Sequence, residues 1–215
     1  LNLAVRAGTP SCGHRIVHRT NSDADSECGN DLLRYAELQA FFAEDPIEEA
    51  GRPLHSFVYP NRDTQQRLFG SRNTFVARPW SYEMHIRWTK PGNTAVAHEL
   101  AHLFTAPFGG GPLSVATDDG IFVHLGLVEG IALAADWPPS ELTPHEAAAA
   151  MRALEIAPDL RTLFEPAGFW SQPSGKAYTL MGSFVRWLVD SRGMPDFKKV
   201  YAHGDWEGVY GTTTD

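Results

Sequence analysis

Two patterns of apolar and polar residues divide the chain near residue 106. Before it, stretches in which apolar and polar residues alternate, as they do in strands, are mixed with stretches of helical spacing. After it, apolar residues recur every three or four positions, as in helices that bury one face. We therefore predict an α+β fold in one domain over residues 1–215. A small twisted N-terminal sheet with helices would occupy residues 13–106, and a mainly helical lobe residues 107–203.

The N-terminal lobe is expected to hold both strands and helices. Alternation predicts strands at residues 13–20 and 54–59, and one or two more within residues 75–88. Helical spacing predicts a helix over residues 31–44 and a short one over residues 63–69. A Pro-Asn pair directly after position 59 is a turn signal, and it is expected to end the second strand.

The C-terminal lobe is expected to consist of successive helices. A helix at the junction of the two lobes begins near residue 93 and ends before Pro107. Within the C-terminal lobe, helices are predicted at residues 122–136, 175–191 and 195–201, with a frayed end at 211–215.

One further helix in this lobe carries its own start signal. Thr143 stands where a helix cap is needed, Pro144 at the first helical position and Glu146 three residues after the cap. This is the capping-box pattern, in which the two side chains satisfy each other's backbone N–H groups.

Composition and charge narrow the classes of function. With 43% apolar and 20% charged residues, the chain has the composition of a globular protein with a sizeable core. The formal net charge is −8 and no cluster of Lys and Arg is present, so we expect no nucleic-acid partner. The sequence contains no apolar run of the length that spans a bilayer.

The cysteines bear on localisation. Cys12 and Cys28 are the only two, and both lie near the N-terminus, which suits one disulfide in an exported protein. An extracellular or cell-envelope location is therefore expected. Two other interpretations remain open: a pair of reduced thiols, or a second zinc site that would include His14 and His18.

The candidate chemistry lies in the helix at the junction of the two lobes, in the sequence His98-Glu99-Leu100-Ala101-His102. Residues four apart on a helix share a face and lie about 5–6 Å apart, so the two imidazoles can bind one zinc ion. Glu99 is turned by about 100°, where its carboxylate can act as general base toward a water molecule at the metal. The apolar neighbours of these residues predict a buried helix, in which two histidines and a glutamate need a partner such as a metal.

A third ligand is expected from the next helix. Glu129 stands there in Leu127-Val128-Glu129-Gly130-Ile131-Ala132, and a lone carboxylate on so apolar a helix is costly unless it is paired or metal-bound. The small residues Gly130 and Ala132 would allow close approach to the zinc helix. Asp118, Asp119 and His124 are weaker candidates, because the two aspartates lie in a glycine-rich loop that reads more simply as a solvated turn.

These two sequences together resemble the gluzincin zinc peptidases, whose signature is H-E-x-x-H followed by E-G-x-A on the next helix. The stretch that begins at Tyr178 is similar to the M1 aminopeptidases and the related peptidase MA domains. The resemblance implies a zincin-like fold, one zinc ion held by His98, His102 and Glu129, and Tyr178 as a hydrogen-bond donor to the oxyanion. No Gly-x-Met-Glu-Asn sequence occurs, so the resemblance does not extend to recognition of a free N-terminus.

The function predicted from the sequence is therefore a zinc-dependent peptidase, and an endopeptidase in particular, acting on a peptide or protein substrate. His85, on the alternating stretch before the zinc helix, is a candidate for a cleft edge that hydrogen-bonds such a substrate, and otherwise a surface residue. Two alternatives remain: a catalytically inactive or regulatory zincin-like binding domain, and a helical interaction domain without metal.

Overall fold

The computed structural model describes residues 11–12, 16–19, 25–87, 95–118, 120–137, 141–165 and 167–212, and up to residue 32 it describes the backbone alone. The chain divides into two compact units, residues 1–104 and 105–215. The fold is of the mixed α+β kind that the sequence predicts, with the larger sheet in unit 1 and mostly helices in unit 2. The zincin fold that the resemblance implies stays a prediction.

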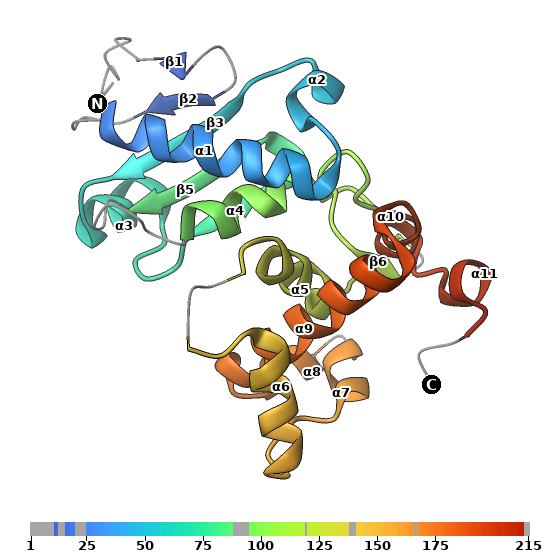
Figure 1. Cartoon of the computed structure of the whole chain (residues 1–215). Coiled ribbons are helices and arrows are strands. Elements are labelled where there is room, and N and C mark those ends of the chain that lie inside the picture. The colour runs from blue at the N-terminus through green and yellow to red at the C-terminus, as the bar shows by residue number, and fades with distance from the viewer. Residues whose placement is uncertain are drawn as a thin grey trace. The chain divides into compact units, whose positions relative to one another are not determined.

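Unit 1 is built on one five-stranded sheet with the order β1-β2-β3-β5-β4 (Figure 1). Its strands are β1 (Ser11–Cys12), β2 (Ile16–Arg19), β3 (Leu54–Tyr59), β4 (Val76–Arg78) and β5 (Glu83–Arg87). The central strands β2, β3 and β5 run parallel, whereas the outer strands β1 and β4 run antiparallel to their neighbours. Parallel strands are usually covered on both faces, so side chains on either face of β3 and β5 are expected to be buried.

The helices of unit 1 are α1 (Asp25–Phe42), α2 (Pro46–Ala50), α3 (Arg62–Phe69) and α4 (Ala95–Phe104). The longer two, α1 and α4, lie side by side (Figure 1), and α4 packs against β4 and β5. On the sheet, Met84 and Ile86 of β5 alternate with His85, so the two sets of side chains point to opposite faces. Phe69 of α3 stacks on His85 and so covers the second face.

The region predicted to hold one or two strands, residues 75–88, contains β4 and β5 joined by a short 3-10 helix at Pro79–Ser81. Pro79 fixes the start of that turn, and Tyr82 closes it in the left-handed conformation with φ of 56°. The alternating strand therefore begins at Glu83 and not at Tyr82.

Unit 2 consists of a two-stranded sheet and helices. Its elements are β6 (Thr117–Asp118), β7 (Phe122–Val123), α5 (Leu125–Ala135), α6 (Pro144–Ala153), α7 (Leu160–Phe164), α8 (Gly168–Ser171), α9 (Ser174–Arg192), α10 (Met194–His203) and α11 (Trp206–Tyr210). Helix α9 is the centre of the unit, because α5, α6, α7, α8 and α10 all pack against it. The capping box of α6 is confirmed: the Thr143 side chain accepts from the Glu146 N–H, and the Glu146 carboxylate accepts from the Thr143 N–H.

Candidate metal centre

The two histidines of the H-E-x-x-H sequence lie on α4, one turn apart. Their rings meet edge to face, with centroids 4.9 Å apart and an angle of 85° between the ring planes. His98 is partly exposed, whereas only 8% of the surface of His102 is accessible. The shared helix face that the four-residue spacing predicts is therefore present, and one imidazole can be reached from solvent.

Aromatic packing holds α4 in place. Phe104, in its last turn, is completely buried, and its ring lies 4.9 Å from Tyr35 and 5.5 Å from Phe42, both on α1. Leu100 and Ala101, between the two histidines, are also fully buried. A site carried by a helix this tightly packed keeps its geometry better than one on a loop.

Glu99 follows His98 on the same helix and is also buried, with 8% of its surface accessible. A rotation of about 100° separates neighbouring residues on a helix, so the carboxylate leaves α4 in a different direction from the two imidazoles. This placement matches the one that a general base beside a metal needs, namely next to the ligands but not among them.

His98, His102 and Glu129 form a group of three metal-ligand donors. Each offers one nitrogen or oxygen atom, and these atoms all lie within 4.8 Å of one another. Ligands of a tetrahedral zinc ion lie about 2.0–2.2 Å from the metal and so roughly 3–4 Å apart. Two imidazole nitrogens and one carboxylate oxygen are donors that a divalent metal such as zinc accepts, so this group could hold a metal ion.

Within unit 2, close packing against α9 fixes the helix that carries Glu129. A Cβ atom at Gly130 would lie 2.8 Å from Cγ2 of Val185 and 3.0 Å from the Met181 carbonyl oxygen. From the other side, a Cβ at Gly182 would lie 2.5 Å from Cδ2 of Leu133. The atoms nearest to a Cβ at Gly130 thus belong to α9, while its expected role in approach to the helix of the H-E-x-x-H sequence stays a prediction.

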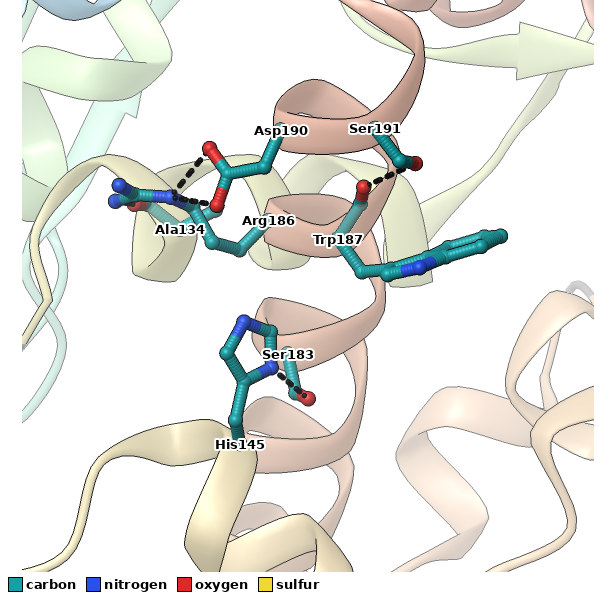
Figure 2. A network of polar contacts seen from close by, with 7 residues as sticks. All are labelled: Ala134, His145, Ser183, Arg186, Trp187, Asp190 and Ser191. Atoms are coloured by element: carbon teal, nitrogen blue, oxygen red, sulfur yellow. Dashed lines mark hydrogen bonds and ion pairs between the residues drawn. The ribbon is translucent and has the colours of Figure 1, made fainter.

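An arginine from α9 closes the C-terminal end of α5. Arg186 donates to the Ala134 carbonyl oxygen at 3.3 Å, and its Nε is held by the Asp190 carboxylate at 2.9 Å (Figure 2). The last carbonyl groups of a helix have no partner within it, and a cation there also suits the helix dipole. The guanidinium further lies 5.4 Å from the centre of the Trp137 ring.

The opposite end of α5 explains why His124 does not join the donor group. Its imidazole caps the helix by accepting from the Leu127 N–H at 3.4 Å, and the ring meets Phe164 edge to face. His124 is buried, with 4% of its surface accessible, in this structural role. Of the two aspartates that were weaker candidates, Asp118 is part of β6 while Asp119 lies outside the described residues.

Tyr178 lies in the second turn of α9 and is partly exposed. Its ring contacts Phe169 of α8 edge to face, at 5.2 Å between centroids. The oxyanion role implied by the resemblance stays a prediction.

The expectation for His85 was wrong. It was predicted to edge a cleft or lie on the surface, but it is buried, with 5% of its surface accessible. Its ring stacks between Phe57, at 4.7 Å, and Phe69, at 3.8 Å, and Nδ1 lies 2.8 Å from the Tyr59 hydroxyl. Burial, and secondarily the charge of Arg78, lower the pKa of His85 to about 4, while Glu83 acts in the opposite direction.

One polar contact was not predicted from the sequence. His145 of α6 and Ser183 of α9 are joined by a hydrogen bond of 2.8 Å between Nδ1 and Oγ (Figure 2). The two residues are far apart in sequence, and no local pattern announces the contact. Among the described residues no carboxylate contacts His145, whose ring instead meets Trp137. Ser183 also lies within a regular helix, so the arrangement lacks the oriented base of a nucleophilic triad.

No family model, curated protein or solved structure matches this chain. Among the helices that the structure describes, none combines the length and apolar character needed to cross a bilayer. The structure describes Cys12 in β1 and Cys28 in α1 by their backbone alone. The predicted disulfide joins their side chains, so it lies outside the described part.

Proposed function

We propose that the protein is a zinc-dependent peptidase of the gluzincin type, with a zincin-like fold. The observation that carries the proposal is the group of donors on His98, His102 and Glu129, whose ligand atoms lie within 4.8 Å of one another. The H-E-x-x-H sequence and the E-G-x-A sequence assign the same three residues independently of the coordinates.

The composition of the donor group favours a catalytic over a structural metal. Structural zinc sites are usually closed by four protein ligands, most of them cysteine, whereas catalytic sites hold three and keep one position open. Two imidazoles and one carboxylate are such a set of three. When bound there, zinc would polarise a substrate carbonyl group and lower the pKa of water.

The residues of the chain divide the remaining work. Glu99, buried beside His98, would accept a proton from the attacking water and pass it to the leaving amine. Tyr178, through its phenolic O–H, would donate a hydrogen bond to the developing oxyanion.

The outer strand of the sheet in unit 1 offers a place for an extended peptide. Among the strands that the structure describes, β4 pairs with β5 alone, and α4 packs against both. An extended peptide can add to such an edge through main-chain hydrogen bonds, which recognise any sequence. We therefore assign a peptide or protein, rather than a small molecule, as the substrate.

Metal content of the purified protein tests the ligand set. Wild type, Glu129→Ala and the control Glu141→Ala, which removes an exposed carboxylate, are prepared side by side without added metal and analysed for all transition metals. We expect about one zinc per chain in wild type and control, and at least a tenfold weaker zinc affinity in Glu129→Ala. Wild type without zinc, even after incubation with it, contradicts the proposal, as does iron in its place, because two histidines and one carboxylate also bind non-haem iron.

Glu99→Gln separates a peptidase from a zinc-binding domain without activity. The variant keeps the side-chain size and all three proposed ligands, so it should retain zinc while losing hydrolysis of a mixed peptide library by a factor of 100 or more. Zinc in both proteins and no peptide cleaved by wild type would instead favour the inactive or regulatory binding domain.

A further inference from the structure

One cavity lies wholly within unit 2 and includes none of the proposed metal ligands. Its volume is about 390 Å³, and it opens between α7, α9 and α11. Small-molecule sites in proteins begin at about 300 Å³ and combine apolar walls with a few polar groups. This cavity has both, and neither the metal nor the proposed peptide edge accounts for it.

The walls are formed by a continuous cluster of aromatic rings. Phe164 contacts Phe184 and Trp206 at 5.6 and 5.4 Å between centroids, and Trp206 contacts Tyr210 at 5.8 Å. Trp187 extends the cluster outward from Phe184 at 6.0 Å, and half of its surface, 50%, is accessible. An exposed tryptophan beside an apolar hollow keeps a large apolar area in contact with water, which is unfavourable. A ligand with a flat apolar body would cover that area.

Positive charge is placed on the same cavity. Arg161 and Arg192 both line it, and among the described residues neither forms an ion pair. The one carboxylate in the wall, Asp159, accepts from the Arg161 backbone N–H at 3.0 Å as the cap of α7. In a chain whose net charge is −8, two arginines at one hollow form a local positive site.

Tyr210 contributes its ring rather than its hydroxyl to the cavity wall. The Oη atom is shielded from solvent and has no hydrogen-bond partner in the described residues. Burial raises the pKa of Tyr210 to about 12, with Asp196 raising it further and Arg192 lowering it. Tyr210 is therefore a neutral phenol near neutral pH and adds no charge to the cavity wall.

From this geometry we propose that the cavity between α7, α9 and α11 binds a carboxylic acid with an aromatic body. The rings of Phe164, Trp187 and Trp206 would enclose the body, while Arg192 would hold the carboxylate. Arginine is suited to this task because its fork of N–H groups matches the two carboxylate oxygens. The site is distinct in residues from the metal centre and does not depend on the protein's being a peptidase.

The test compares 2-naphthylacetate with its neutral counterpart 2-naphthylacetamide. Titration calorimetry measures the affinity of both probes, and the indole signals of Trp187 and Trp206 in NMR spectra report the location. We expect saturable binding of the acid, with the amide at least tenfold weaker. Arg192→Gln should reduce the affinity for the acid about tenfold and leave that for the amide unchanged, since only the acid gains from the charge.

Two further variants and one control keep the result interpretable. Trp187→Ala removes an exposed wall and should weaken both probes, whereas Tyr210→Phe keeps the ring in the wall and should bind both probes like wild type. Arg152→Gln, an exposed arginine of α6 away from the cavity, should change nothing.

The titration is repeated after a chelator has removed any metal. Binding that disappears with the metal, equal affinity for acid and amide, an Arg192→Gln protein that binds like wild type, or no saturable binding at millimolar probe would each overturn the proposal.

Discussion

Unit 1 should lose stability as the pH falls through the range in which His85 is protonated in the unfolded chain but not in the folded one. The pKa of His85 is lowered from 6.5 to about 4, chiefly by burial. The unfolded chain therefore binds the proton more tightly, so the free energy of unfolding is highest above pH 6.5 and falls as the pH drops toward 4. Each unit of pKa corresponds to 1.36 kcal/mol, so His85 accounts for about 3 kcal/mol over this range.

Two variants separate the titration of His85 from the hydrogen bond that it makes. His85→Phe keeps a ring between Phe57 and Phe69 but cannot be protonated, so it should remove the His85 contribution to the pH dependence. It also leaves the Tyr59 hydroxyl without its partner at 2.8 Å, which should cost about 1–3 kcal/mol at pH 7. The matched variant Tyr59→Phe breaks the same hydrogen bond but keeps the imidazole, so it should lose stability and keep the pH dependence.

The measurement must report on unit 1 alone. Urea unfolding at several pH values between 4 and 7.5, followed by hydrogen exchange of peptides that cover β3 and β5, gives the free energy of opening the central sheet. The quantity compared is the change with pH in each variant, since carboxylates titrate in the same range in all three proteins. A His85→Phe protein whose stability varies with pH as strongly as that of wild type would refute the argument.

Two further predictions concern stability in unit 2. Gly130→Ala should destabilise the protein by about 1–3 kcal/mol, because the new Cβ would lie 2.8 Å from the Val185 side chain. The control is Gly175→Ala, whose Cβ would have no atom within 4 Å. It should be neutral or stabilise α9 by up to about 1 kcal/mol. Thermal unfolding checks the pair, and equal melting temperatures would contradict the assigned close contact. Thr143→Ala should cost about 1 kcal/mol by removing the cap that accepts from the Glu146 N–H, measured as faster amide exchange at the start of α6; unchanged exchange would count against the capping box.

Elements with strong local signals could be predicted well from the sequence. The strand at residues 54–59 has the predicted bounds, because prolines stand directly on both sides of it. The helix that begins at Pro144 was predicted from a cap whose bonds are formed within four residues. Helices α7, α8 and α11 were missed, since four or five residues are too few to show a helical period.

The candidate site region likewise contains one feature that the sequence could predict and one that it could not. The shared face of His98 and His102 follows from helix geometry alone, so spacing was enough to predict it. The position of His85 was not predictable from alternation, which identifies two faces of a strand but not which of them is covered. In a parallel sheet both faces are buried, and here the polar side of β5 lies under Phe69, from a separate helix.

The outer strands of the sheet in unit 1 bear on how readily its edges could pair with another copy of the chain. An open strand edge is a template for pairing with another copy, and long, flat, apolar edges promote aggregation. Here β4 has three residues and is followed at once by Pro79, which has no N–H to donate, and β1 has two. Such short edges can form only a few main-chain hydrogen bonds. These are enough for a single extended segment to lie along β4, but too few to support a repeating array of identical chains.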